Sequence, residues 1–313
     1  MKCLVTGGAG FIGSHIVDEL LAQNFEVIVI DNLSTGNISN LSDKVKFYNM
    51  DILDSDVQQV FSKEKPDYVI HHAAQVSVPF SMNNPLNDAE ININGTINLL
   101  EEAVKNNVSK FIFASSAAVY GFPNQISIDE NHNTKPISPY GMSKLTAENY
   151  IKMYSDIHGI DYTIFRYANV YGPRQDVKGE AGVVAIFVEK LLNNKKCTIF
   201  GDGKQTRDFI YVKDIATANV KALNSKSSSK QVLNLGLNER TSIIELFNII
   251  REFTSNSSHS PIYSDCRSGD IKHSCLSNIE AKNVLNWLPQ YDVDKGLQET
   301  VRFFEEMKTL MKL

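Results

Sequence analysis

The chain has 313 residues, of which 42% are hydrophobic and 21% charged, so it can bury a large core and is long for a single domain. Its 31 basic and 36 acidic residues give a net charge of −5, which argues against nucleic acid as the main partner. No apolar run approaches the ~20 residues of a membrane span, and the four cysteines form no C-x-x-C motif. We therefore expect a soluble, cytoplasmic protein without a membrane partner or a zinc site.

Short apolar runs rich in β-branched residues alternate with helical patterns through the first half of the chain. Helical composition is clear at residues 14–24 and again at residues 89–107. Apolar runs without polar alternation are typical of parallel strands that are buried on both faces. These runs cover residues 2–6, 26–31, 45–50, 67–74, 110–116 and 161–172. We predict an α/β fold built on a doubly wound parallel Rossmann sheet.

The alternation loosens after about Pro173, where a helix is expected over residues 179–196 and a further buried strand over residues 230–236. Two Ser-rich stretches, 224–230 and 255–260, are predicted to be surface loops. We predict two interleaved domains. Residues 1–174, joined by about 206–235, form the sheet domain, and residues 175–205 with 236–313 form a smaller substrate domain.

A glycine turn follows the first predicted strand. Gly7, Gly10 and Gly13 have G-x-x-G-x-x-G spacing, and they lie between a strand and a helix. Glycines at this point let the backbone turn tightly and approach a pyrophosphate at the helix N-terminus. The next strand ends in Asp31, whose carboxylate can accept hydrogen bonds from the adenosine ribose and would repel a 2′-phosphate. The pattern predicts that the cofactor is NAD rather than NADP.

A tyrosine and a lysine lie four residues apart in "SPYGMSK", at the start of a predicted helix. Tyr140 has to lose roughly 2 to 3 units of pKa to act as a base near neutral pH, and Lys144 on the same helix face can supply the positive field. Taken alone, such a pair is more often an exposed ion on a helix surface. However, the strand before this helix ends in Ser115 and Ser116, and a hydroxyl there can share a substrate proton with Tyr140.

The motifs together resemble those of one enzyme family. The chain carries "TGGAGFIG", the serine strand, "YGMSK", "RYANVYGPR" and "GDGKQTRDFIYVKDIA" in this order. From residue 1 to about residue 290 it resembles the UDP-glucose (UDP-galactose) 4-epimerase family of the extended short-chain dehydrogenase/reductase superfamily. The resemblance implies NAD as the cofactor, a UDP-sugar as the substrate, and a homodimer that pairs helices 92–107 and 141–158.

The resemblance also assigns roles to single residues. Tyr140 is implied to be the base, Lys144 to bind the nicotinamide ribose and lower the tyrosine pKa, and Ser116 to relay the proton. For Asn92, the sequence by itself favours a helix-surface amide. The residues implied to contact NAD are Gly7, Gly10, Phe11, Ile12, Gly13, Asp31, Asn32, Leu33, Ser34, Thr35, Gly36, Asp51, Ile52, Ala73, Ala74, Gln75, Asn92, Ser115, Tyr140, Lys144 and Tyr167.

The substrate would contact Ser116 and Tyr140 and a further set of residues downstream. Asn169 follows the sixth strand and is implied to contact the diphosphate. Arg207 and Arg267 resemble the two arginines that bind the diphosphate, which suits the paired hydrogen bonds of a guanidinium. Asp270 resembles the carboxylate that holds the uridine ribose. Ser274 matches a position beside the sugar 2-substituent, where a small residue leaves room for an N-acetyl group; an ordinary serine with local hydrogen bonds is an equal alternative.

The predicted reaction is reversible 4-epimerisation of a UDP-hexose through a transient 4-keto sugar. Related dehydratases carry an Asp-Glu pair where this chain has Ser116 and Ala117, so it lacks the extra acid and base that water elimination needs. UDP-glucose and UDP-galactose are the expected substrates, with UDP-GlcNAc and UDP-GalNAc also allowed. UDP-glucuronate epimerisation, another nucleotide-sugar epimerase or dehydratase activity, and a non-catalytic NAD-sensing role stay open. The adjacent His71 and His72 are expected to be packed rather than to bind metal.

Overall fold

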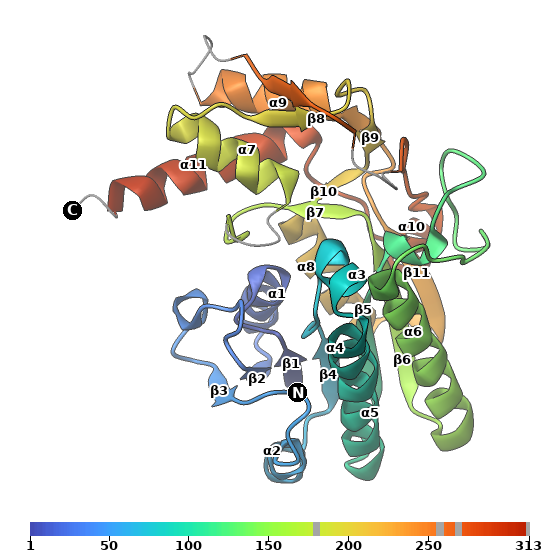
Figure 1. The fold of residues 1–313 in the computed structure, drawn as a ribbon. Coiled ribbons are helices and arrows are strands. Elements are labelled where there is room, and N and C mark those ends of the chain that lie inside the picture. The colour runs from blue at the N-terminus through green and yellow to red at the C-terminus, as the bar shows by residue number, and fades with distance from the viewer. Residues whose placement is uncertain (178–181, 255–259, 267–270, 311–313) are drawn as a thin grey trace.

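The computed structural model describes residues 1–177, 182–254, 260–266 and 271–310. Seven parallel strands form the central sheet (Figure 1), which confirms the predicted doubly wound Rossmann architecture. In spatial order the strands are β11 (Gln231–Leu235), β6 (Asp161–Tyr167), β5 (Lys110–Ser116), β4 (Tyr68–His71), β1 (Lys2–Thr6), β2 (Glu26–Asp31) and β3 (Lys46–Asn49). The strand order reverses between β1 and β4, and in such sheets ligands bind at the carboxyl ends of the strands beside this point.

Helices cover both faces of the sheet and create two apolar cores. One core packs helices α1 (Phe11–Ala22) and α8 (Val212–Asn224) on the sheet. The other packs α2 (Val57–Glu64), α5 (Gly95–Lys105) and α6 (Pro139–His158) on the opposite face. The strands form because their side chains are apolar on both faces, and most residues of β1, β2, β4, β5 and β6 are buried, whereas the edge strand β3 is only half-buried or exposed. The sheet therefore holds its carboxyl edge rigidly.

A second group of elements lies above this edge in Figure 1. Its apolar core packs three helices against short strands. The helices are α7 (Val183–Leu192), α9 (Ile243–Phe253) and α11 (Val293–Leu310). The strands pair as β7 (Asn169–Tyr171) with β10 (Phe209–Tyr211), β8 (Thr198–Phe200) with β13 (Ile262–Ser264), and β9 (Thr206–Arg207) with β12 (Thr241–Ser242).

The last elements do not all belong to this second core. Helix α10 (Ile279–Leu285) and Trp287 pack into the core that holds α1 and α8. Strand β11 closes one edge of the central sheet beside β6. The predicted division into two domains stays a prediction. Strand β11 lies in the segment predicted to return to the sheet, whereas α10 and Trp287 lie in the range predicted for the substrate domain.

Three local expectations were wrong. Residues 89–107 do not form one α-helix, because α4 (Pro85–Ala89) passes through a π-helical segment (Glu90–Asn94) before α5 begins. The run 161–172 is divided between β6 and β7, which belong to different sheets. The stretch 224–230 is not a plain surface loop, since Ser228 is buried and its hydroxyl accepts a hydrogen bond of 2.7 Å from Lys110 Nζ.

Other short segments connect these elements. A helix, α3, spans Val78–Asn83 ahead of α4. Short 3-10 turns lie at Ile38–Asn40, Ala117–Tyr120 and Lys226–Ser228. None of the helices within the described ranges of the chain has the length and apolar character needed to cross a bilayer.

Candidate active site

The glycine turn between β1 and α1 has the geometry that a close ligand requires. Gly7 has φ +67, and a Cβ there would lie 2.6 Å from the backbone nitrogen of Ala73. A Cβ on Gly13 would collide with the Gly7 carbonyl oxygen. Gly10 is the N-cap of α1, and Phe11 and Ile12 open its first turn, where backbone N–H groups have no partner within the helix. The turn thus offers backbone donors at a positive helix end.

The carboxylate of Asp31 lies at the end of β2, buried beside the turn. It accepts hydrogen bonds from the backbone nitrogens of Ala9 at 2.9 Å and Leu33 at 2.8 Å, so its position is held by the chain itself. Gly36 leaves room for it, because a Cβ there would lie 2.8 Å from Asp31 Oδ1. Asn32 donates a 2.6 Å hydrogen bond to Asp51 at the end of β3. The structure therefore brings the loop 31–36 and residue 51 together.

The other predicted NAD contacts after β2, β3 and β4 differ in how far their side chains are buried. Ser34 and Thr35 are exposed, whereas the side chain of Ile52 is buried under Gly95. Ile52 can therefore reach a cofactor only through its backbone. Ala73 and Ala74 follow β4 and are half-buried against the glycine turn.

Asn92 is not the helix-surface amide that the sequence favoured. The side chain is 2% exposed, and its amide closes a two-way pair with the backbone of Gln75, at 2.9 Å and 3.0 Å. It also donates to Asp88 at 3.2 Å and Ser143 at 3.1 Å. The π-helical segment turns this residue inward, and π-bulges occur often at functional sites. Asn92 thus joins the loop after β4 to the helix that carries Tyr140.

Tyr140 lies in the first turn of α6, which begins where the Ser138 hydroxyl caps the helix. Its side chain lies next to that of Ser116, at the carboxyl end of β5, close enough for the serine hydroxyl to influence the tyrosine pKa. Its backbone nitrogen donates a 3.2 Å hydrogen bond to the hydroxyl of Ser81. The predicted pair of hydroxyls is therefore brought together, and Ser81 is a supporting residue that no sequence pattern indicated.

Lys144 lies one turn further along α6, and its side chain is buried. The ammonium group donates a 2.9 Å hydrogen bond to the Ala114 carbonyl oxygen and lies 4.9 Å from the centre of the Phe113 ring. It lies 6.0 Å from the centre of the Tyr140 ring. Burial lowers the pKa of Lys144 to about 8, and the charge of Asp88 opposes this shift. The lysine is close to the tyrosine but does not hydrogen-bond to its hydroxyl.

The pKa of Tyr140 differs from expectation. The sequence pattern and the resemblance predicted a lowered tyrosine pKa, but burial raises the pKa of Tyr140 above its ordinary value of 10, although the hydrogen bond with Ser116 lowers it. The physical reason is that burial disfavours the charged phenolate, and the negative charge of Asp88 adds to this effect.

Ser115 and Tyr167 have side chains that make internal contacts. The hydroxyl of Ser115 donates a 2.6 Å hydrogen bond to Glu148, which in turn forms a buried ion pair with Arg166. The Tyr167 ring is buried and stacks with His72, and its hydroxyl is bonded to Asn219. No sequence pattern indicated Glu148, because an acid on a helix is usually solvated.

Three of the substrate candidates gather above the same edge. The backbone nitrogen of Asn169 in β7 donates to the Asp208 carbonyl at 2.9 Å, and Arg207, the residue before Asp208, ends β9. The nitrogen of Ser274 donates to the Thr206 carbonyl at 3.2 Å. Asn169 is exposed, and Arg207 and Ser274 are half-buried. Arg267 and Asp270 lie outside the described residues.

The buried histidines make polar contacts inside the fold. His71 bonds the hydroxyls of Thr6 at 2.7 Å and Thr96 at 3.0 Å. The pKa of His72 is lowered to about 3 by burial and then by the charge of Lys144, so its ring is neutral at pH 7. Among the residues that the structure describes, no three His, Cys, Asp or Glu side chains gather as they would around a metal ion.

Comparison with known proteins points to one family. Residues 3–236 match the model of the NAD dependent epimerase/dehydratase family. The chain is 48% identical over 303 residues to a putative UDP-glucose 4-epimerase of Methanocaldococcus jannaschii, covering 96% of this chain and 98% of that protein. It is 41% identical to a UDP-glucose 4-epimerase of Mycolicibacterium smegmatis, covering 97% and 98%.

A solved structure shows the same likeness. The UDP-glucose 4-epimerase of Thermotoga maritima with UDP-glucose superposes with a TM-score of 0.95 at 43% identity, covering 98% of this chain and all of that one. The resemblance that the motifs suggested is thereby confirmed. The chain belongs to the NAD dependent epimerase/dehydratase family, in its UDP-glucose 4-epimerase group.

Proposed function

We propose that this protein catalyses the reversible 4-epimerisation of UDP-hexoses, UDP-glucose and UDP-galactose above all, through a transient 4-keto sugar. The observation that carries the proposal is the trio of Ser116, Tyr140 and Lys144 at the carboxyl edge of the sheet. Ser116 ends strand β5, and the other two residues lie in α6, the next α-helix along the chain. It is supported by relatives of nearly equal length that are named UDP-glucose 4-epimerases. The 33% identical dTDP-D-glucose 4,6-dehydratase is a more distant relative, and the chain has Ala117 where dehydratases need an acid.

The residues around the glycine turn fit NAD. The space that a Cβ would fill at Gly7 and Gly13, the backbone donors at the start of α1, and the fixed carboxylate of Asp31 suit a pyrophosphate and an adenosine ribose. We propose that the predicted contact residues hold it, with Ser115, Ile52 and Tyr167 taking part through backbone or packing. When bound, NAD supplies a reversible hydride acceptor and, in its oxidised form, a positive charge.

Within this site, the side chains of the chain handle the proton. Tyr140 takes the proton of the C4 hydroxyl and later returns one, and Ser116 hydrogen-bonds the same oxygen and keeps it in line with Tyr140. Lys144 binds the nicotinamide ribose hydroxyls and adds positive potential at Tyr140. Burial raises the pKa of Tyr140, so positive charge in the loaded site would favour its phenolate form. Proton transfer is thereby coupled to the presence of the cofactor.

The diphosphate lies, in this proposal, between Asn169, Arg207 and Arg267, and Asp270 binds the uridine ribose. Ser274 borders the sugar and leaves room for a 2-N-acetyl group, so UDP-GlcNAc and UDP-GalNAc are substrates as well. A UDP-N-acetylglucosamine 4-epimerase of Methanobrevibacter ruminantium is 39% identical to this chain with a TM-score of 0.92, which supports this wider range.

Replacing Tyr140 by Phe tests the mechanism. Loss of a general acid–base group costs about 10²- to 10⁴-fold in rate, so we expect turnover of UDP-galactose to fall by at least about 100-fold while bound NAD is retained. Tyr150→Phe, on the same helix, is the matched control and should keep full turnover. Normal epimerisation by Tyr140→Phe would exclude the proposed base.

We also propose a homodimer and a cytoplasmic location. Met142, Met153 and Ile157 are 51%, 43% and 65% exposed and share one face of α6, a pattern that favours burial against a second copy. Light scattering should give twice the chain mass, and Met153→Glu should shift it to the monomer; a monomeric parent would refute the dimer. The free cysteines suit a reducing compartment.

A further inference from the structure

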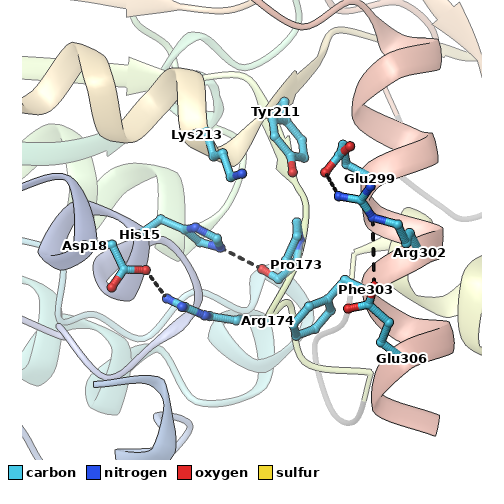
Figure 2. Close-up of a pocket in the computed structure, with 10 residues that line it drawn as sticks. All are labelled: His15, Asp18, Pro173, Arg174, Tyr211, Lys213, Glu299, Arg302, Phe303 and Glu306. Atoms are coloured by element: carbon cyan, nitrogen blue, oxygen red, sulfur yellow. Dashed lines mark hydrogen bonds and ion pairs between the residues drawn. The ribbon is translucent and has the colours of Figure 1, made fainter. Parts of the chain in front are cut away.

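A cavity of about 310 Å³ lies away from Tyr140, where α1, the loop after β7, the start of α8 and α11 meet (Figure 2). Its wall includes His15 on α1, Arg174 in the loop, Tyr211 and Lys213 at the start of α8, and Arg302 on α11. None of these side chains is among the groups proposed to contact NAD or the UDP-sugar. The volume is at the lower end of the range of small-molecule pockets, roughly 300–1,000 Å³.

The acids of this cavity are already paired. Arg174 forms an ion pair of 2.8 Å with Asp18 across the gap between the loop and α1. Arg302 pairs with Glu299 at 2.7 Å and with Glu306 at 4.0 Å along α11. Figure 2 shows these pairs at opposite sides of the cavity. These pairs take in all three carboxylates of the wall and both of its arginines.

Lys213 is the cation that remains. Its side chain lines the cavity, and within the described part of the chain no ion pair is recorded for its ammonium group. His15 adds no charge at neutral pH, because burial lowers its pKa to about 4. Its Nε2 donates a 3.0 Å hydrogen bond to the Pro173 carbonyl, which fixes the loop against α1. The wall as a whole carries three carboxylates and three cations, so it has no net charge, and Lys213 is its cation without an ion pair among the described residues.

The hydroxyl of Tyr211 indicates a ligand site independently of the charges of the wall. The residue is 1% exposed, yet its hydroxyl has no hydrogen-bond partner among the described residues. Figure 2 shows this hydroxyl pointing into the cavity, between Lys213 and Glu299. Burial raises the pKa of Tyr211, so the group stays protonated and acts as a donor. A buried hydroxyl is normally paired, and this one requires an acceptor from outside the fold.

We propose that this cavity binds a small molecule through one oxyanion group, a carboxylate or a phosphate. Lys213 neutralises the charge and Tyr211 donates a hydrogen bond to one of the oxygens. The ligand also joins α1, which carries the glycine turn, to α11 at the other side of the cavity. Occupancy therefore stabilises the folded chain, because the ligand binds only where the four segments meet.

Thermal unfolding of the NAD-loaded protein, saturated with UDP, tests this site while the other phosphate positions are filled. Inorganic phosphate and acetate are titrated separately against chloride of equal ionic strength. We expect a concentration-dependent rise in Tm above the chloride reference. A rise with phosphate alone assigns a phosphate ligand, and a rise with both anions assigns a carboxylate-sized oxyanion; either result supports the site.

Variants separate the site from general salt effects. Tyr211→Phe removes only the unpaired hydroxyl, so it should unfold in chloride at the parent temperature or above and lose at least ten-fold in anion affinity. Lys213→Met should lose the response and Lys213→Arg should keep it. Lys226→Met, an exposed lysine outside the cavity, is the matched control and should respond like the parent.

Three results would overturn the proposal. Destabilisation by Tyr211→Phe in chloride would show that the hydroxyl has a partner in the protein itself. Equal anion responses of the parent, Tyr211→Phe and Lys213→Met would place the anion elsewhere. A crystal of the loaded protein grown in phosphate, with only a water at the Tyr211 hydroxyl, would show that the cavity is simply hydrated.

Discussion

The charge of Glu148 should stabilise the protein strongly, because it lies at the centre of a buried network below the catalytic turn of α6. Its Oε1 accepts hydrogen bonds from Ser115 at 2.6 Å and from Arg166 Nε at 2.9 Å, and its Oε2 accepts one from Arg166 Nη2 at 2.7 Å. Glu148 is 0% and Arg166 4% exposed. Glu148→Gln preserves the shape of the side chain and removes only its charge.

The magnitude follows from burial. Removing one partner of a buried pair leaves an uncompensated charge and costs about 3–5 kcal/mol. With an unfolding entropy of about 2.1 cal/mol/K per residue, a chain of 313 residues loses about 1.5 °C of Tm per kcal/mol. We therefore expect Glu148→Gln to lower Tm by about 5–8 °C.

Calorimetry of the NAD-loaded parent and variant measures this shift, and turnover of UDP-galactose measures its effect on Tyr140 and Lys144. The control is Glu26→Gln, because Glu26 pairs with Lys46 at 2.6 Å and both side chains are nearly half exposed, at 44% and 48%. Its Tm should stay close to that of the parent, since exposed pairs contribute little. A Glu148→Gln variant that melts within about 2 °C of the parent would refute the reasoning.

Three further variants test separate parts of the structure. Ser274→Tyr should reduce turnover of UDP-N-acetylhexosamines selectively, measured beside UDP-galactose, and equal loss on both classes would contradict the size argument. Gly13→Ala places a methyl group against the Gly7 carbonyl, so the purified protein should carry much less NAD by absorbance, and a full NAD content would contradict the close turn. Burial raises the pKa of Asp208 to about 7, above the ordinary value of 3.8. Between about pH 4 and pH 7 the carboxyl ionises in the unfolded chain but not in the folded one, so its contribution to stability falls as pH rises. Asp208→Asn should remove this slope in urea unfolding, and identical slopes would contradict it.

The parts of the fold that could be predicted from sequence depend on the pattern of residues within short stretches of the chain. The strands of the sheet could be identified because residues such as 26–31 are apolar without interruption, which is typical of burial on both faces. The glycine turn and the placement of Tyr140 and Lys144 on one helix face follow from spacing alone. Ser116 could be placed beside them because parallel strands end at a common edge.

Other features could not be predicted, because they depend on contacts between residues far apart in the chain. Asn92 is buried by a π-helical turn and by its pairing with Gln75, which hydrophobic periodicity does not reveal. The sign of the Tyr140 pKa shift depends on how deeply the ring is dehydrated, which is a property of the packed site.

Spacing along the sequence thus determined which side chains lie at a strand end or share a helix face. Both follow from the regular geometry of a single helix or strand. Only the tertiary structure decided which polar groups are buried and whether they find partners. Tyr211 illustrates the difference: its hydroxyl is left unpaired among the described residues by helices that meet from three parts of the chain. The loss of water around a polar group and the electrostatic effect on it depend on all of its neighbours in space. Both are therefore determined only when the chain has folded.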